Sequence, residues 1–480
     1  MSTTVMSNPT LNPYTGPIHL TRPHFVGIGG SAMSALAQLC QARGAKVSGT
    51  DAVDSERIAV LRDLGCAVTI GHDPAAVHGA SCVVYTAVTQ ASPEVAAALD
   101  AGIPVVHRAQ VLQALSTDRR LVAVAGTHGK STTTGILAAA LRALGEDPSY
   151  LVGADLDQPG SGARHGKGDL IIAEADESDH SFQLLAPYAA VVTTIAHDHP
   201  ENYANLREHI DAYTTFVNGL RGGGIFVANA DDDSVRVLIE RVRTQRPDVH
   251  VVTYGHDERA TVRVQSVERR GWSAKVRVTL PGETPVVIRL HTPSRQHAHN
   301  AVAALAVLAA LGTDPVAAAE AVSTFVGVRR RFMPVGENAG VTVIDCYADH
   351  PNEIAADLEA ARAVAGTHRV LAVVQPSGYA RVAAFGRDMG TALAAGADHT
   401  VLLDVHGAGP QGAVSSTIVG DAIAAAGGHL LFAGLGAAAH EVATLARPGD
   451  VILMMGTGNV TDLAGPILAA LAQDRLTVSR

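Results

Sequence analysis

A glycine-rich stretch in the first third of the chain constrains the fold more than any other feature. Residues 121–134 read LVAVAGTHGKSTTT. The apolar run at 121–125 predicts a buried parallel strand, and residues 132–141 predict a helix. A strand that turns through glycine into a helix N-terminus points backbone N–H groups and the helix dipole at an anion. The stretch therefore predicts an α/β domain with a phosphate site.

The residue types in this turn indicate a nucleotide. Gly126 and Gly129 permit a tight turn, Lys130 adds a charge for the outer phosphates, and Ser131 offers a hydroxyl to Mg²⁺. The general P-loop spacing requires a glycine where this chain has Val124, so the motif is the shorter GTxGK[ST]T variant. An ordinary strand–turn–helix without a ligand is the alternative. The expected nucleotide-binding residues are Gly126, Thr127, Gly129, Lys130, Ser131 and Thr132.

Composition excludes several classes of function. The net charge is −10 and aromatic residues make up 4% of the chain, which argues against nonspecific binding of nucleic acid or anionic membranes. The four cysteines are scattered without a CxxC pair, so neither a disulfide framework nor a cysteine zinc site is expected. No signal peptide or membrane span is evident. We expect a cytoplasmic protein that is a monomer or a weak homodimer.

Pattern changes along the 480 residues divide the chain into about three domains. Residues 1–18 are polar and Pro-rich, which predicts a disordered arm. Strand and helix patterns alternate through 19–115, which predicts a Rossmann-like domain, and again through 326–480, which predicts a second one. Between them, 116–325 predicts a central P-loop ATPase domain with a parallel sheet. Its segment 250–291 has alternating polar and apolar residues, which predicts a small antiparallel patch.

A second glycine-rich turn lies near the N-terminus. Gly27, Gly29 and Ala32 match G-x-G-x-x-[GA] after a strand, with Gly30 doubling the second glycine. Asp51 ends the next strand, near the acidic position that contacts a ribose in dinucleotide-binding folds. The pattern fits NAD, FAD or any nucleotide diphosphate, and it also fits a turn that only packs helix on strand.

Carboxylates and histidines follow two strands of the predicted central sheet. Glu174 opens the string EADESD after one buried strand, where ligands bind in open α/β sheets. It is the expected Mg²⁺ partner, although acids on a surface loop are the alternative. His197 and His199 end the next strand. Zinc would need further ligands that lie nowhere close by in sequence, so we expect His199 to face the magnesium site, with a solvated loop histidine as the alternative.

Further candidates lie in the second half of the chain. Asn300 opens a predicted helix, where it hydrogen-bonds an adenine edge or caps and packs the helix. Arg331 belongs to the string GVRRRF, and Arg forks suit phosphate, although a solvated basic turn is the alternative. Polar residues at predicted strand ends complete the set: Asp345, Tyr347, Asp349, His350 and Arg381.

The motifs, taken in order, resemble one family. The strings GIGG, GTHGKSTT, AEADESD, GVRRRF and MGTGNVT span nearly the whole chain and are similar to those of the Mur ligases. The resemblance implies an N-terminal domain for the UDP part of a substrate, a central ATP domain and a C-terminal domain that closes over both. ATP then phosphorylates a carboxylate, and an amine attacks the acyl phosphate. Joining UDP-N-acetylmuramate to L-alanine is the expected reaction.

The resemblance also implies a role for each candidate residue. Lys130, Glu174, His199, Arg331 and His350 become catalytic residues. Ser131, Glu174 and His199 become the magnesium site. Asn300 is placed at adenine, Arg331 at phosphate and Asp345 at ribose. The substrate-binding residues become Gly27, Gly29, Gly30, Asp51, Tyr347, Asp349 and Arg381.

Departures from the family pattern concentrate on the amine and acyl side. Asp349 stands where the family has histidine, Cys346 where it has aspartate, and Ser377 where it has another histidine. Aspartate for histidine replaces a hydrogen-bond donor by an anionic acceptor. A relative that joins a different amine or carboxylate is therefore the main alternative. A non-catalytic nucleotide-binding protein and a dehydrogenase are the others.

Overall fold

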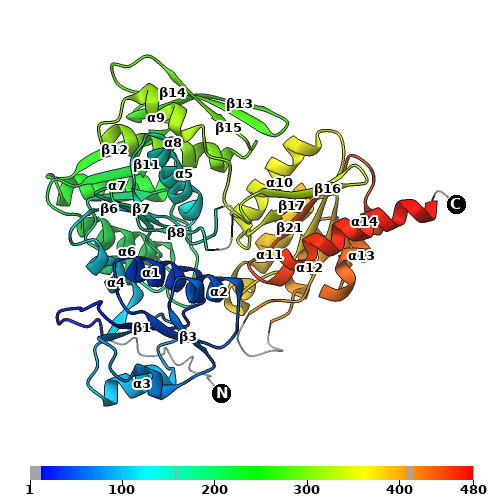
Figure 1. The fold of residues 1–480 in the computed structure, drawn as a ribbon. Coiled ribbons are helices and arrows are strands. Elements are labelled where there is room, and N and C mark those ends of the chain that lie inside the picture. The colour runs from blue at the N-terminus through cyan, green and yellow to red at the C-terminus, as the bar shows by residue number, and fades with distance from the viewer. Residues whose placement is uncertain (1–11, 157, 159, 408–413, 479–480) are drawn as a thin grey trace.

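The structure is a computed structural model that describes residues 12–156, 158, 160–407 and 414–478. Its strands form three sheets of five, ten and six strands, which follow one another along the chain. The first sheet lies below the central one in Figure 1, and the third lies to their side. The predicted α/β fold with three sheet-based units is confirmed.

The first sheet is wholly parallel in the order β3-β2-β1-β4-β5, which is Rossmann-like. Its strands are β1 (Pro23–Val26), β2 (Ser48–Asp51), β3 (Ala67–Ile70), β4 (Cys82–Tyr85) and β5 (Val105–His107), with helices α1 (Ser31–Ala42), α2 (Glu56–Asp63), α3 (Pro93–Asp100) and α4 (Arg108–Leu115).

The N-terminal segment corrects one prediction. Tyr14 and Ile18 pack against a hydrophobic core that the first and central units share, and the Gln110 side chain donates to the carbonyl of Tyr14 at 2.7 Å. The prediction of a disordered arm over residues 1–18 is therefore wrong for 12–18, because two side chains there pack, partly buried, against the core. Residues 1–11 lie outside the described part of the chain.

The central sheet has the order β15-β14-β13-β12-β11-β10-β6-β9-β7-β8. Its strands are β6 (Arg120–Ala125), β7 (Ser149–Leu151), β8 (Ala163–Arg164), β9 (Leu170–Glu174), β10 (Ala189–Val192), β11 (Ile225–Asn229), β12 (His250–Gly255), β13 (Val262–Arg270), β14 (Ser273–Thr279) and β15 (Val286–Leu290). Its helices are α5 (Lys130–Ala143), α6 (Leu206–Asn218), α7 (Asp233–Gln245), α8 (Arg295–Ala310) and α9 (Pro315–Val322).

The antiparallel patch is smaller than predicted. β13, β14 and β15 pair antiparallel, but β12 pairs parallel with β11 through five residue pairs. The prediction of an antiparallel patch over 250–291 is thus wrong for 250–255. The interior of β12 is buried on both faces, as in other strands of a covered parallel sheet, while β13 alternates between buried and exposed residues.

The third sheet has the order β16-β17-β21-β18-β19-β20, parallel except for β16 at one edge. Its strands are β16 (Met333–Asn338), β17 (Val341–Cys346), β18 (Val370–Val374), β19 (His399–Leu402), β20 (Leu430–Phe432) and β21 (Val451–Met455). α10 (Pro351–Ala365), α11 (Tyr379–Gly396) and α12 (Thr417–Ala425) cover one face, and α13 (Leu435–Leu445) and α14 (Ala464–Val478) cover the other.

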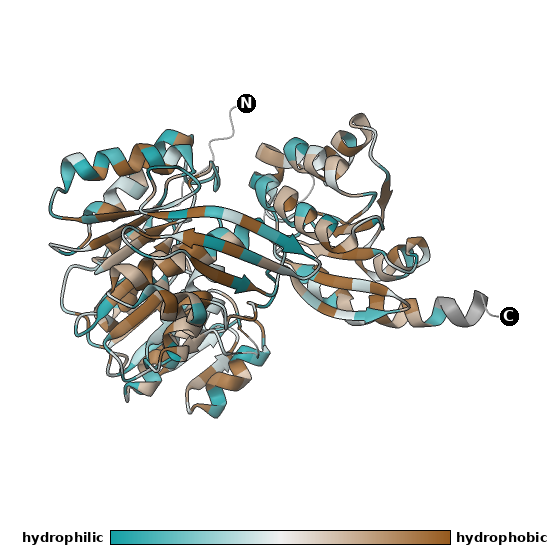
Figure 2. Ribbon diagram, turned by 90° about the horizontal axis from the view of Figure 1, so that it is seen from above, coloured by the Kyte–Doolittle hydropathy of each residue, from teal (hydrophilic) through white to brown (hydrophobic). Residues whose placement is uncertain are grey.

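Hydropathy follows this layering. Many of the strands are hydrophobic along their length, whereas the helices carry both hydrophobic and hydrophilic residues (Figure 2). The hairpin of β13 and β14 extends from the central sheet to the third one, where Arg269 pairs with Glu359 at 2.9 Å and the Trp272 ring lies 6.1 Å from that of Phe332. Within the described ranges, none of the helices combines the length and apolar character that a membrane crossing requires.

Candidate active site

A cavity of about 1070 Å³ lies where the three sheets meet. Its wall includes Arg57 from the first unit, Lys130 from the central unit and Arg381 from the third. The carboxyl ends of β6, β9, β10 and β17 all lead into loops that line it. This is where open α/β sheets bind ligands, so the cavity is the candidate active site.

The turn between β6 and α5 needs its glycines. Gly126 has a φ of +135°, and a Cβ there would collide with the Thr193 side chain. Gly129 has a φ of +87° as the N-cap of α5, and a Cβ there would collide with the Asn300 amide. At both positions the backbone lies so close to its neighbours that any residue with a side chain would collide with them. α5 begins at Lys130, two residues before the predicted start, because Gly129 already turns the chain into the helix.

Lys130 is held inside this turn. Its Nζ donates to the Gly126 carbonyl at 2.8 Å and to both carboxylate oxygens of Glu177 at 2.9 Å. Glu177 is fully buried. Burial lowers the pKa of Lys130, but the carboxylates of Glu177, Asp176 and Glu174 outweigh it and raise the pKa above its ordinary value. The ammonium is therefore charged and fixed at the cavity wall.

The three predicted magnesium residues all line the same cavity. They are Ser131 at the start of α5, Glu174 at the end of β9 and His199 in the loop after β10. Burial raises the pKa of Glu174, although the Gly153 N–H and the Arg331 guanidinium act against it. A buried carboxylate whose partners do not offset its desolvation is a good ligand for a hard cation. The oxygen-rich donor set fits Mg²⁺.

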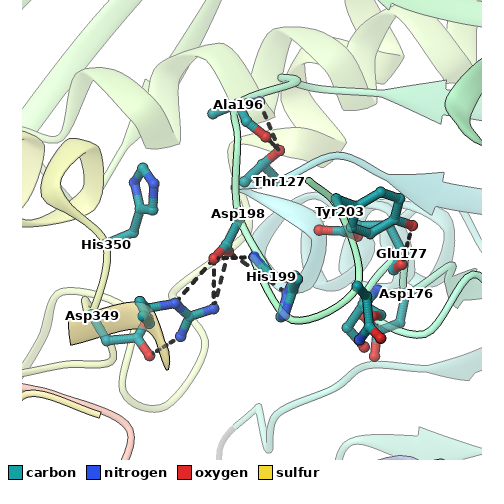
Figure 3. A network of polar contacts seen from close by, with 12 residues as sticks. Thr127, Asp176, Glu177, Ala196, Asp198, His199, Tyr203, Asp349 and His350 are labelled. Carbon is teal, nitrogen blue, oxygen red and sulfur yellow. Dashed lines mark hydrogen bonds and ion pairs between the residues drawn. The ribbon is translucent and has the colours of Figure 1, made fainter. Parts of the chain in front are cut away.

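Other residues of the site join the central and third units. The Arg381 guanidinium donates three hydrogen bonds to the Asp198 carboxylate, at 2.9 to 3.0 Å, and pairs with Asp349 on its other side. Figure 3 shows Asp198 and Asp349 on the two sides of these dashed contacts. Arg381 holds the pKa of Asp198 well below its usual range, against the effect of burial. Burial raises the pKa of Asp349 to about 6 even though Arg381 lowers it.

A second set of contacts connects the turn at residues 126–131, named the phosphate turn below, to helix α10. His128 Nδ1 lies 3.1 Å from Glu353, and Arg331 lies 4.0 Å from the same carboxylate. Arg331 also donates to the Ser131 hydroxyl at 3.4 Å and stacks over the Tyr347 ring at 4.5 Å. Arg331 is thus a partly buried, ordered cation beside the predicted metal site and not a solvated turn.

The two remaining nucleotide candidates, Asn300 and Asp345, do not themselves line the cavity. Asn300 is buried and lines a small pocket of about 30 Å³ together with Gly129 and Thr132. Asp345 accepts a hydrogen bond from Thr461 at 2.7 Å, but its Oδ1 has no partner among the described residues. Burial accordingly raises the pKa of Asp345. An unpaired buried acceptor suits a ligand hydroxyl such as that of a ribose.

His350 does not line the cavity. It is the N-cap of α10, where its Nδ1 accepts from the Asn352 N–H at 3.3 Å and its Nε2 lies 3.3 Å from the His197 carbonyl. Figure 3 shows it apart from the Asp198 and Asp349 pair. Burial lowers its pKa to about 4, so the ring is neutral at neutral pH. His197 is likewise packed, against Phe385 and His209.

The first glycine turn lies beside the cavity. Gly27 and Gly30 make the turn into α1, and the Asp51 carboxylate accepts from the Gly29 N–H at 2.8 Å. None of these four residues lines the cavity, whereas Ser31 and Ala32, which follow them, do. Asp51 therefore fixes the glycine turn, and Ser31 and Ala32 at the start of α1 line the cavity.

Sequence reasoning missed several charged residues of the site. Arg108 pairs with Asp176 at 2.8 Å, and Arg57 pairs with Asp155 at 3.2 Å, so both join the first unit to the central one at the cavity. Glu177 and Asp198 lie inside the strings at 174–179 and 193–201, but several neighbouring residues there are also acidic or histidine, so the strings alone do not single them out. Arg57 and Arg108 lie on ordinary helices with no motif, so only the fold reveals them.

A glycine turn at a helix N-terminus, a lysine fixed within it and the predicted magnesium residues meet where the three α/β units join, an arrangement typical of a nucleotide-dependent enzyme. Three family models match in order: "Mur ligase family, catalytic domain" over residues 22–120, "Mur ligase middle domain" over 124–308 and "Mur ligase, glutamate ligase domain" over 330–458.

Known relatives match over nearly the full length. A UDP-N-acetylmuramate–L-alanine ligase of Streptomyces avermitilis is 46% identical over 464 residues, which cover 95% of this chain and 99% of the relative. One of Kineococcus radiotolerans is 42% identical, covering 98% and 100%. The crystal structure of a UDP-N-acetylmuramate–alanine ligase from Thermotoga maritima superposes with a TM-score of 0.77 at 25% identity, covering 96% and 100%. The chain belongs to the Mur ligase family, whose members are ATP-dependent enzymes that form amide bonds.

Proposed function

We propose that this enzyme joins UDP-N-acetylmuramate to L-alanine, coupled to the conversion of ATP to ADP and phosphate, a step of peptidoglycan synthesis in the cytoplasm. The observation that carries the proposal is the cavity, which combines the phosphate turn, the predicted metal residues and the Asp198–Arg381–Asp349 cluster within one space. The names of full-length relatives support this choice of substrates.

The residues of the cavity suit phosphoryl transfer to a carboxylate. A carboxylate is a poor electrophile, and phosphorylation gives it a leaving group. The turn at 126–131 would bind the ATP phosphates through backbone N–H groups, with Lys130 and Arg331 stabilising the charge that develops on the transferred group. Glu177 acts as a positioning residue, because it accepts from Lys130 through both oxygens.

Ser131, Glu174 and His199 would hold Mg²⁺, which neutralises phosphate charge when bound. Asn300 would contact adenine and Asp345 the ribose. Residues 19–115 would bind the UDP part beside the turn at Gly27, Gly29 and Gly30, with Arg57 and Arg108 offering guanidinium groups to the diphosphate. Residues 116–325 would bind ATP, and 326–480 would close over the amine.

Weakening the proposed metal site should slow the reaction and make it depend more strongly on the Mg²⁺ concentration. Glu174→Gln keeps the shape of the side chain but removes a charge that Mg²⁺ requires. We expect turnover to fall by about 100-fold at limiting Mg²⁺ and to recover in part at high Mg²⁺. Glu208→Gln, at an exposed carboxylate on α6, is the matched control. Unchanged Mg²⁺ dependence of phosphate release in Glu174→Gln would contradict the assignment.

A panel of candidate amines tests which amine the enzyme uses. Phosphate release is measured with ATP, Mg²⁺ and UDP-N-acetylmuramate against the standard amino acids and several other amines, for the wild type and for Asp349→His. We expect L-alanine to be the best amine of the wild type. Asp349 pairs with Arg381 at the cavity, so histidine there should weaken amine binding by removing one of the two carboxylates that hold the guanidinium. Turnover with another amine would instead favour the relative with changed specificity.

A further inference from the structure

A second group of metal-ligating side chains lies outside the cavity, at the carboxyl edge of the central sheet. Asp231 follows β11, His256 follows β12, and His299 stands in the second turn of α8. Each residue offers one potential ligand atom, and these three atoms all lie within 4.8 Å of one another. None of the three lines the cavity. The parallel pairing of β11 and β12 brings the first two residues to the same edge.

Backbone hydrogen bonds fix the carboxylate of this group. The His256 N–H donates to both oxygens of Asp231 at 2.8 Å, and the Asp257 N–H donates to its Oδ1 at 2.9 Å. Oδ1 therefore accepts two hydrogen bonds and Oδ2 accepts one from these groups. Oδ2 keeps a lone pair for a further partner, and it lies 3.9 Å from His299 Nδ1.

That 3.9 Å separation is too long for a hydrogen bond between Asp231 and His299. Zinc-type ions bind nitrogen and oxygen at about 2.0–2.2 Å, which places ligand atoms of a tetrahedral site roughly 3.4 Å apart. The rings of His256 and His299 have centroids 5.4 Å apart and are inclined by 53°, so they do not stack flat on one another. His256 is exposed, and a rotation of its side chain can bring its nitrogen closer.

We propose that Asp231, His256 and His299 bind one divalent transition-metal ion of the zinc type, with the remaining positions open to water. Two imidazoles and one carboxylate suit Zn²⁺, Co²⁺ or Ni²⁺, whereas Mg²⁺ prefers oxygen ligands. The bound ion would link the ends of β11 and β12 to α8, and His299 adjoins Asn300 on that helix. The site is therefore distinct from the magnesium site at the phosphate turn.

Cobalt absorption tests the proposal directly. The full-length protein is stripped of metal with a chelator and titrated with Co²⁺ in the absence of nucleotide. We expect one equivalent of Co²⁺ to produce a visible ligand-field absorption band, of the kind given by cobalt with a low coordination number and nitrogen ligands. Zn²⁺ should displace the cobalt, and a large excess of Mg²⁺ should not. His299→Leu and His256→Ala should each weaken cobalt binding by at least about 10-fold.

Two variants serve as controls. His78→Ala removes an exposed histidine of the first unit and should keep the band. Ser131→Ala alters the proposed magnesium site and should also keep it, which separates the two sites. His256 is exposed, so its variant should fold even if His299→Leu does not. Absence of a band in the wild type, or an unchanged cobalt affinity in His256→Ala, would overturn the proposal.

Discussion

Replacing Lys130 by methionine is expected to lower the turnover number by about 1000-fold or more. The ammonium is the cation fixed in the phosphate turn, where it contacts the Gly126 carbonyl and Glu177. Methionine keeps the apolar stem of the side chain but removes the charge that would stabilise the transferred phosphoryl group. The measurement is steady-state release of phosphate from ATP with both other substrates saturating.

The variant needs a control for folding, because it leaves Glu177 buried without its cation. An unpaired buried charge costs about 3–5 kcal/mol. The double variant Lys130→Met with Glu177→Gln removes both charges and should regain thermal stability without regaining turnover. Lys167→Ala, at an exposed lysine, should behave as wild type. Turnover of the folded double variant within about 10-fold of wild type would refute the role of Lys130.

Replacing Arg381 by methionine is expected to lower the turnover number by at least about 100-fold and to favour an open arrangement of the third unit. Arg381 is on α11 of the third unit, while Asp198 follows β10 of the central unit. Without the guanidinium, Asp198 and Asp349 face each other as buried carboxylates with no cation between them. Their repulsion would push the two units apart.

Small-angle X-ray scattering and kinetics check this prediction together. The radius of gyration of Arg381→Met should exceed that of the wild type, and the KM for the amine should rise. Arg387→Ala removes an exposed arginine from the same helix and should change neither quantity. An Arg381→Met enzyme with the wild-type KM and the wild-type radius would show that this ion-pair cluster does not hold the units together.

Local signals made much of the fold predictable. The buried strand, glycine turn and helix at 121–141 depend on residues that are adjacent in sequence, so the pattern alone specifies them. The pairing direction of the strand at 250–255 is harder to predict from sequence. Its partner β11 lies more than 20 residues earlier, and the two strands run parallel because helix α7 crosses over between them. The packing of Tyr14 against the first sheet was equally hidden, because it depends on α4 far along the chain.

For the candidate site, too, residues in local motifs could be predicted from the sequence, whereas residues brought in by packing could not. Lys130, Ser131, Glu174 and His199 sit in motifs at strand ends, and the structure brings all four to one cavity. Arg57 and Arg108 reach it only because their helices pack beside the central unit, which no local pattern reports. His350 shows the opposite case: it stands in a motif, yet it caps a helix, because the cap position satisfies the free N–H of Asn352.

The most direct test of the proposed chemistry follows one oxygen atom. UDP-N-acetylmuramate is prepared with a carboxylate labelled with the heavy isotope of oxygen and is turned over with ATP, Mg²⁺ and L-alanine. An acyl phosphate intermediate predicts that one labelled oxygen per turnover appears in the released phosphate, together with the amide product, by mass spectrometry. Unlabelled phosphate released alongside that amide would contradict phosphorylation of the carboxylate, and absence of the amide would contradict the proposed pair of substrates.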